Sequence, residues 1–407
     1  MTSTEISKKV RERLEGVHIG CFEGRDKPVI LISEHYPGIW LEHVNDSVVY
    51  AIMDKSKLYL AENAIDLFLS NQKEDGQLPC YVLDRKRATK EKGWTTIVGY
   101  SQIQECTSLA RLSLLVYQMN QNVDFLKKAY TCTEKWVKWL EKNRMTTGRG
   151  LVEMFVGFDT GHDNSGRLQG MSYEGNYCSD AAKLPPDDVA PIIAVDMNCN
   201  FYATLASLSE MASELGLTEE EKTWRAKAKT VKDKLFEICF NKDDCFFYDV
   251  DKHGNQRKYL SSTIFHLFME RVLDKNEDKE LICQLYERHI SNPDEFATPY
   301  PYPSMAISDP SCKGHKDFNC WGYYTQGNTA LRSALWMEDY GFHKDFERLC
   351  RAWIKAWNEH FDEIKLGQEL DPVSGIPTKC SEWYSPTMIF YLYAEKYIEE
   401  HNSKDLK

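Results

Sequence analysis

The segment Gly150–Arg167 gathers residues that could do acid–base chemistry. It contains Asp159, His162, Asp163 and Arg167 between glycines that do not favour a helix. Asp and Asn also make ordinary polar turns, so a surface loop is the alternative interpretation of this segment. Cleavage of a glycosidic bond would use an acid placed here, because a carboxyl group must protonate the leaving oxygen.

A second acid lies in the segment Gly367–Gly375. The end of this segment reads Asp-Pro-Val-Ser-Gly, which is strong turn chemistry, but a turn does not require Glu369. Glycoside hydrolysis needs two carboxyl groups that flank the bond. The two segments together are therefore candidates for the two sides of one site.

A sugar site also needs aromatic planes for the faces of the sugar and polar groups for its hydroxyls. Trp321 stands between glycine-rich flanks rather than in a helical stripe, and Trp40 and Tyr324 also lie near loop sequence. Gln102 follows a polar loop at the start of a helical pattern. We expect these four residues to contribute to sugar binding.

The pattern of apolar residues is helical from about residue 47 to the C-terminal end. In 123–142 one stripe is clear, formed by Leu126, Ala129, Tyr130, Thr133, Trp136, Val137 and Leu140. Further helices are predicted at 48–71, 105–119, 197–215, 219–239, 260–273, 278–290, 326–340, 344–361 and 385–400. A β-hairpin is predicted over 243–255, and β-prone residues occur at 28–32.

Four long loops separate these helices, at 72–103, 144–195, 291–325 and 362–384. Long loops inside a compact helical protein are usually functional. A long functional loop occurs at every second connection between helices. Paired helices that close into a ring would produce this spacing, because every second connection then lies at the same rim. We predict an all-α fold, an (α/α)6 barrel with the long loops at one rim and a few short strands. It would form a single domain over 1–407, with residues 1–45 as an N-terminal segment leading into the barrel.

The composition of the chain excludes several classes of partner and binding site. The chain of 407 residues has a net charge of −12, which argues against nucleic acid and anionic membranes as partners. The residues before Gly16 are charged, and no stretch approaches the roughly 18 apolar residues of a membrane span. The 13 cysteines include no C-x-x-C pair, and the 11 histidines form no metal-binding pattern. We expect a cytoplasmic protein with a small carbohydrate substrate, no cofactor and no metal; the sequence does not predict an oligomeric state.

The segment from Asp159 to Arg167 resembles the E-S-G-W-D-x-S-x-R element of the inverting α-glycosidases that include trehalases (glycoside hydrolase family 37) and processing glucosidases (family 63). Mannosylglycerate and glucosylglycerate hydrolases belong to the second family. Four other segments are similar to elements of this clan and occur in its order: 40–47, 72–79, 195–198 and 369–375. The resemblance spans about 36–395 and implies the barrel that the helical pattern predicts.

The resemblance also implies roles for the acids. Asp163 would be the general acid, and Glu369 the general base, about 6.5–9.5 Å away in an inverting enzyme. Asp46, in the segment Trp-Leu-Glu-His-Val-Asn-Asp-Ser, would bind sugar hydroxyls, or else cap the helix that follows it. Arg167 would hold a sugar oxygen with its planar fork, or else pair with Asp159.

This sequence departs from the clan at three places. The clan tryptophan before the general acid is His162, which could bind the sugar or fill space. In the element that ends at Gln326, Trp321 is kept but the clan arginine is Gly322. The base motif is shifted by one residue, so that Gln368 stands four residues before Pro372, where the clan has its glutamate. Glu382, in the loop before the last helix, is therefore a rival for the base.

The sequence thus predicts a glycosidase that cleaves an α-linked glucoside or mannoside of a small oligosaccharide or a glycosyl-glycerate, with inversion. Two alternatives remain. A sugar epimerase or isomerase on the same barrel would use two histidines as acid and base, and only His162 lies in a suitable loop. A barrel that binds sugar without cleaving it is the other, because the fold alone does not determine function.

Overall fold

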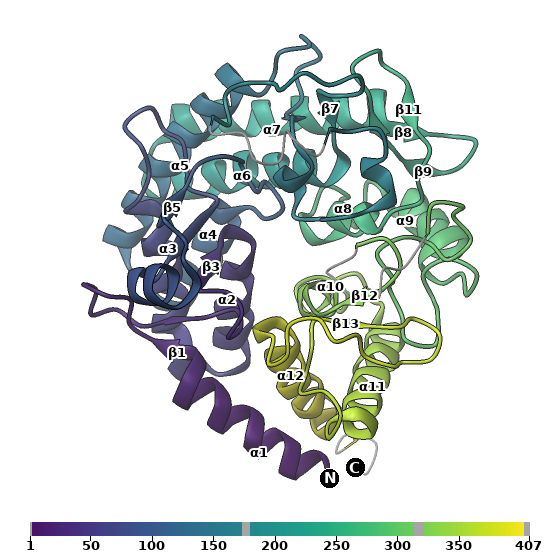
Figure 1. The fold of residues 1–407 in the computed structure, drawn as a ribbon. Coiled ribbons are helices and arrows are strands. Elements are labelled where there is room, and N and C mark those ends of the chain that lie inside the picture. The colour runs from purple at the N-terminus through teal and green to yellow at the C-terminus, as the bar shows by residue number, and fades with distance from the viewer. Residues whose placement is uncertain (1, 173–179, 313–320, 403–407) are drawn as a thin grey trace.

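The computed structural model describes residues 2–172, 180–312 and 321–402, and its helices run around a ring (Figure 1). Helices whose side chains are mostly buried alternate along the chain with helices that bury one face. The mostly buried, inner helices are α2 (Val44–Met53), α4 (Leu109–Asn120), α6 (Val195–Glu214), α8 (Phe265–Met269), α10 (Gly327–Ser333) and α12 (Ser385–Asn402). The outer helices are α1 (Ser3–Arg13), α3 (Leu58–Leu69), α5 (Val123–Asn143), α7 (Thr218–Cys239), α9 (Lys279–Leu285) and α11 (His343–His360).

Inner helices contact one another around the ring: α2 with α4, α4 with α6, α6 with α8, α10 with α12, and α12 with α2. The last contact joins the end of the chain to its beginning and closes the ring. Outer helices pack against their inner neighbours, as α3 does on α2, α7 on α6 and α11 on α12. This is the (α/α)6 barrel that the sequence predicts.

Helix α5 shows why the outer helices form where they do. All seven apolar and threonine positions predicted for its stripe are buried, which confirms that prediction. Asn122 precedes the helix and accepts a hydrogen bond from the backbone N–H of Phe125, so it satisfies one of the free donors of the first turn. Ser108 does the same for α4 through the N–H of Arg111.

One prediction about the first helices was wrong. The single helix predicted over 48–71 is two helices, because Asp54 ends α2 in an extended conformation and accepts from the N–H of Ser56. Residues 1–45 also contain a helix that the sequence analysis did not predict, α1, which begins at Ser3 and is capped by Thr2 and Glu5. The apolar residues of α1 are few, which is why its pattern was missed.

Short antiparallel strands connect the helices. They form the pair β1 (Ile19–Gly20) and β2 (Val29–Ile30), the three-stranded sheet of β3 (Gly38–Trp40), β4 (Tyr81–Leu83) and β5 (Val98–Gly99), the four-stranded sheet of β6 (Glu153–Met154), β7 (Ile192–Ile193), β10 (Asp249–Val250) and β11 (Gln256–Arg257), the pair β8 (Phe240–Asn241) and β9 (Phe246–Phe247), and the pair β12 (Thr325–Gln326) and β13 (Glu369–Leu370). The hairpin predicted over 243–255 contains β9 and β10, which pair not with each other but with β8 and β11 just outside that range. Strand β2 lies in the β-prone segment.

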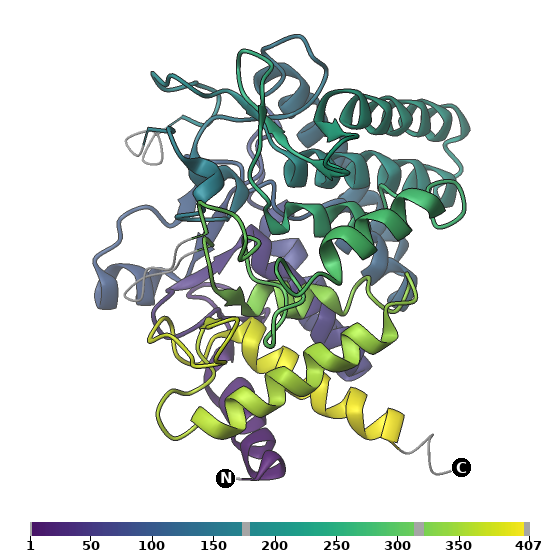
Figure 2. The ribbon, with the colours of Figure 1, turned by 90° about the vertical axis from the view of Figure 1, so that its right-hand side faces the viewer.

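Single turns of 3₁₀ or π helix complete the chain: η1 (Leu14–His18), η2 (Leu41–His43), η3 (Lys55–Lys57), η4 (Lys86–Glu91), η5 (Gly157–Thr160), η6 (Gly166–Leu168), η8 (Ser262–Ile264) and η9 (Tyr286–Ile290). One hydrophobic cluster runs from Ile6 to Tyr397 and joins both ends of the chain to the ring. In the side view, loops and strands gather at one end of the barrel (Figure 2). Among the described residues, no helix is long and apolar enough to cross a membrane.

Candidate active site

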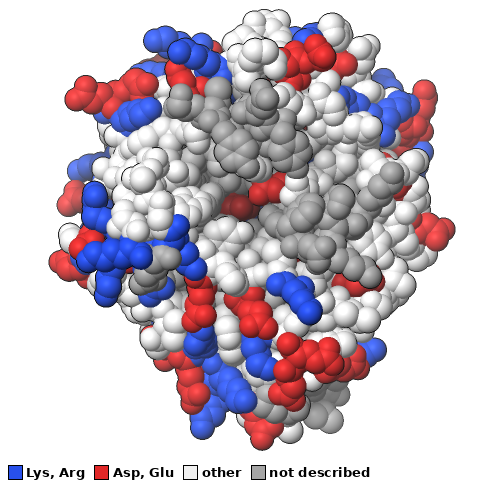
Figure 3. Space-filling view, in the orientation of Figure 1, with Lys and Arg blue, Asp and Glu red and all other residues white. Residues whose placement is uncertain are grey.

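A pocket of about 370 Å³ opens among the long loops. Each of the four loops singled out in the sequence contributes to it, which explains their length. Acidic side chains are visible at the bottom of the hollow on this face of the molecule (Figure 3). The pocket is lined by Tyr36, Trp40, Glu42, His43, Tyr81, Trp94, Ser101, Gln102, Gln104, Phe158, Asp163, Trp321, Asn328, Gln368 and Tyr384.

Asp163 faces this pocket from an irregular stretch of backbone. Gly161 and Asn164, on either side of it, have φ angles of 71° and 60°, so the chain makes two sharp turns around the acid. The Asp163 carbonyl oxygen accepts a hydrogen bond of 3.0 Å from the backbone N–H of Trp321. Burial, and secondarily the negative charge of Glu42, raise the pKa of Asp163 to about 8. A carboxyl group with this pKa carries a proton at neutral pH and can donate it.

Asp159 does not face the pocket but stabilises the loop that carries Asp163. Its carboxylate is fully buried and pairs with Arg144 at 2.7 Å. It also accepts hydrogen bonds from the backbone N–H groups of Ile103, Phe155 and Val156. Asp159 therefore fixes the shape of two loops that line the pocket.

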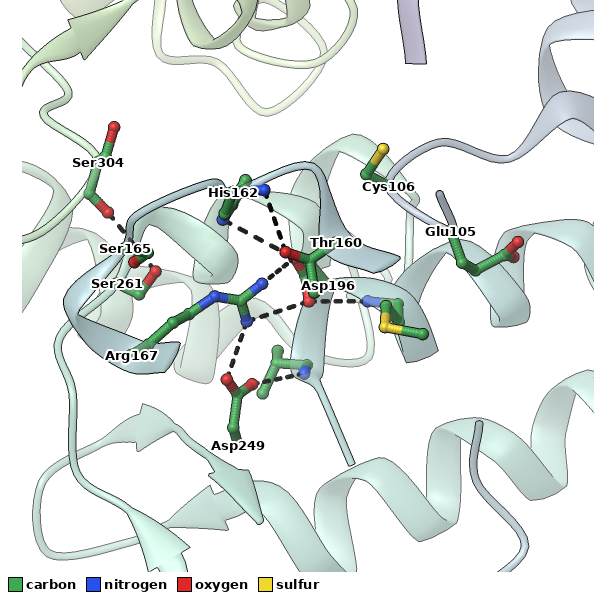
Figure 4. Close-up of polar contacts among 12 residues, drawn as sticks. Glu105, Cys106, Thr160, His162, Ser165, Arg167, Asp196, Asp249, Ser261 and Ser304 are labelled. Atoms are coloured by element: carbon green, nitrogen blue, oxygen red, sulfur yellow. Dashed lines mark hydrogen bonds and ion pairs between the residues drawn. The ribbon is translucent and has the colours of Figure 1, made fainter. Parts of the chain in front are cut away.

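Arg167 is also buried away from the pocket. Its guanidinium donates to Asp196 at 2.6 and 3.2 Å and to Asp249 at 2.9 Å (Figure 4). The ion pair with Asp159 that the sequence suggested as the alternative is not formed. Asp196 opens α6 and Asp249 lies in β10, so Arg167 ties the Asp163 loop to the inner ring and to the four-stranded sheet.

Glu42, which the sequence reasoning passed over, lines the pocket. Its Oε2 atom accepts hydrogen bonds from Arg332 at 2.8 Å and Asn328 at 3.4 Å. Burial raises the pKa of Glu42, and the charge of Arg332 opposes that shift. Asp46, four residues later, does not reach the pocket: its carboxylate accepts from the hydroxyl of Ser385 at 2.5 Å inside the core.

Asn328 links Glu42 to two further pocket residues. Its amide also donates to the hydroxyl of Tyr384 at 3.1 Å, and that hydroxyl lies 2.8 Å from Nε2 of His43. Burial, followed by the charge of Arg332, holds the pKa of His43 well below its usual value, so this histidine is neutral at pH 7. The floor of the pocket is thus a connected polar network in which Arg332 is the cation.

At the start of β13 the pocket residue is Gln368 and not Glu369. Successive side chains of an extended chain point to opposite sides, which places the two in different surroundings. Glu369 is fully buried, and its carboxylate accepts from the Gln326 amide at 3.0 Å and the Thr378 hydroxyl at 2.9 Å. Gln326 does not line the pocket and instead holds Glu369.

His162 lies behind the pocket. Its ring stacks on Trp321 with centroids 4.3 Å apart and planes at 13°. Both residues border a small cavity of about 20 Å³, with His266 on another side. His162, His266 and Asp196 are the one group in the described part of the chain that could ligate a metal ion. Arg167 occupies both oxygens of Asp196, however, so this carboxylate already has its cation.

The remaining predicted residues divide between the pocket and its surroundings. Trp40 and Gln102 line it, as do Trp321 and Asp163. Tyr324 is buried and does not line the pocket. Glu382 is exposed and accepts a hydrogen bond of 3.3 Å from the backbone N–H of Lys365. The sequence reasoning missed Tyr36, Tyr81 and Trp94 among the aromatic residues. The sequence feature that could have identified these three residues is their position in the segment before α2 and in the long loop 72–103.

Comparison with known proteins places this chain in a family. Residues 56–340 match the mannosylglycerate hydrolase MGH1-like glycoside hydrolase domain, which covers well over half of the chain and includes Asp163. The chain belongs to this family. It is therefore an α-glycoside hydrolase, and the isomerase and binding-only alternatives are set aside. A sequence search of curated proteins finds no match.

Solved structures show the same fold as this MGH1-like hydrolase. The GH63 mannosylglycerate hydrolase from Thermus thermophilus in complex with glucose is 17% identical with a TM-score of 0.72, over 95% of this chain and 99% of that one. The structure of the same enzyme in complex with Tris and D-glycerate is 16% identical with a TM-score of 0.71, over 95% of this chain and 99% of that one. Neutral trehalase Nth1 from Saccharomyces cerevisiae is 12% identical with a TM-score of 0.65, over 98% of this chain and 81% of that one.

Proposed function

We propose that this MGH1-like hydrolase cleaves a small α-linked glucoside or mannoside with inversion, and that Asp163 is its general acid. The observation that carries the proposal is the Asp163 carboxyl, which faces a sugar-sized pocket with a pKa raised to about 8. A protonated carboxyl at neutral pH is what the leaving oxygen requires. The Thermus hydrolase binds glucose, which supports a hexose in this pocket.

Glu42 takes the sugar-binding role that the sequence gave to Asp46. Arg332 and Asn328 hold its Oε2 atom, while its Oε1 atom lies 3.9 Å from Nδ1 of the neutral His43. A carboxylate fixed through one oxygen can accept a sugar hydroxyl with the other. Gln102 lines the same pocket and would bind a second hydroxyl.

The general base is proposed to be Glu369. The resemblance puts the base in this segment, but the amide of Gln368 can only orient the attacking water, because an amide does not take its proton. Glu369 is the carboxylate next to it, and it accepts hydrogen bonds from the amide of Gln326 and the hydroxyl of Thr378. Glu42 is the competing assignment, since it is the other carboxylate that faces the pocket with Asp163.

Asp163→Asn tests the acid. The variant should lose at least about a thousandfold in kcat on an α-linked disaccharide, since the leaving oxygen is no longer protonated. It should keep most of its rate on an α-glycosyl fluoride, because fluoride leaves without a proton. Asp362→Asn, at an exposed position that follows α11 and does not line the pocket, is the control. Equal loss on both substrates would contradict the acid role.

Glu369→Ala and Glu42→Ala test the base with the same fluoride. Loss of the base should abolish turnover, and added azide should restore it as a β-glycosyl azide, formed as azide attacks the anomeric carbon and fluoride leaves. Rescue of Glu369→Ala alone supports the assignment. Rescue of Glu42→Ala alone moves the base to Glu42.

A further inference from the structure

The mouth of the pocket carries a group of aromatic rings that no hydrogen-bonding or catalytic role explains. Trp40, Tyr81 and Trp94, here called the aromatic wall, lie with ring centroids 5.2 to 6.1 Å apart. All three line the pocket. Trp94 is 39% exposed, which is unusual for so large an apolar side chain. Part of this apolar surface is therefore available to a ligand.

The aromatic wall is built on the three-stranded sheet. Trp40 in β3 and Tyr81 in β4 are directly paired, so their side chains leave the same face of the sheet. Tyr81 is in turn paired with Gly99 of β5. A Cβ atom at Gly99 would lie 2.2 Å from the ring of Tyr81, so only glycine leaves space for this ring position. The strands thus fix two of the three rings before any ligand binds.

The described lining of the pocket lacks the free cation that an anion-binding site needs. Glu42 and Asp163 are the ionisable carboxyls among its lining residues. Among the described lining residues there is no lysine or arginine, and the guanidinium of Arg332 behind them is paired with Glu42. Acidic side chains lie at the bottom of the hollow on this face of the molecule (Figure 3). A ligand carboxylate here would lose its water and find no unpaired cation among these described residues.

We propose that the leaving group of the substrate is uncharged and presents a flat face to the aromatic wall, as a second pyranose ring does, and that glycerate is disfavoured. This inference rests on the proposed function. The face of a pyranose is apolar C–H surface that stacks on indole and phenol rings, while its hydroxyls remain free for water. Asp163, the proposed acid, lines the same pocket as the aromatic wall.

The charge is tested with a matched pair of ligands. Glucosylglycerol and glucosylglycerate differ only in a CH₂OH group against a carboxylate. Binding is measured by calorimetry at pH 7 and low salt on Asp163→Asn, which does not turn them over and keeps position 163 neutral. We expect glucosylglycerol to bind at least about tenfold more tightly. Tighter binding of glucosylglycerate would overturn the proposal.

The aromatic wall is tested with Trp94→Ala in the same background. Maltose should bind about tenfold more weakly to this variant, while glucose should bind within about twofold of its former affinity. Tyr59→Ala is the control, because Tyr59 is 45% exposed on α3 and does not line the pocket. An unchanged affinity for maltose would overturn the role of the wall. Because binding is read without turnover, a failure of the proposed hydrolysis would leave both results interpretable.

Discussion

Glu42 and Asp163 face one pocket, and the negative charge of Glu42 adds to burial in raising the pKa of Asp163 to about 8. The two residues come from different parts of the barrel, η2 before the first inner helix and the long loop before α6. Arg332, from α10, holds Glu42 in place. The raised pKa of Asp163 thus depends on three segments that lie far apart in the sequence.

The pH dependence of kcat/KM should reflect this relationship. Asp163 is protonated below its raised pKa, so activity should be lost as pH rises through about 8. Glu42→Gln removes the neighbouring charge and should move this alkaline limb to lower pH. Rates with glucosyl fluoride, which needs no proton, should lack the limb. A limb that stays in place in Glu42→Gln would show that the two carboxyls are not coupled.

Asp159→Asn should destabilise the protein by about 3–5 kcal/mol, because it leaves Arg144 buried without its counter-charge. Urea unfolding followed by circular dichroism measures the change. Glu382→Gln, an exposed carboxylate, should change the free energy of unfolding by less than about 0.5 kcal/mol. A double variant that also carries Arg144→Met should recover part of the loss. Equal stability of Asp159→Asn and the parent would contradict a structural role for this pair.

Glu105 makes stability depend on pH. Burial raises its pKa to about 8; one carboxyl oxygen accepts from the indole of Trp136, and the other has no partner. Its contribution to stability is fully present below the unfolded pKa near 4.5 and is lost as pH rises toward about 8. Glu105→Gln should flatten that slope and stabilise the protein at pH 8 by up to a few kcal/mol, measured by urea unfolding at several pH values. A parallel slope in the variant would contradict this.

His162→Ala should raise KM about three- to tenfold, since Trp321 loses the ring on which it stacks. His162→Phe keeps an aromatic plane and should keep most of the affinity. If both variants are equally impaired, the imidazole nitrogens matter rather than the stacking. Steady-state kinetics on one disaccharide separates these outcomes.

Much of the barrel could be predicted from the sequence, because helices show their buried face as a local period. The α5 stripe is the clearest case, and the four long loops do supply the pocket. The predictions that were wrong concerned side chains whose partners lie far away in the sequence. Arg167 finds Asp196 and Asp249 rather than Asp159, and neither is near it in the sequence.

Single-residue shifts were beyond the sequence for the same reason. Glu42 lies in η2 and lines the pocket, whereas Asp46, four residues later in α2, is buried against Ser385. At the start of β13, one step of an extended chain exchanges Gln368 for Glu369. Asp163 could be predicted as an acid of the site, but Glu42 could not, nor could the side to which Asp46 and Glu369 point.

The stereochemistry of hydrolysis tests the central claim most directly. The purified protein would be incubated with α-linked glucosides and mannosides, and the anomeric protons followed by NMR in the first minutes, with Asp163→Asn beside it. We predict that the first sugar released is the β-anomer and that the variant releases none. Release of the α-anomer, or full activity of Asp163→Asn, would contradict inversion by a site in which Asp163 is the acid.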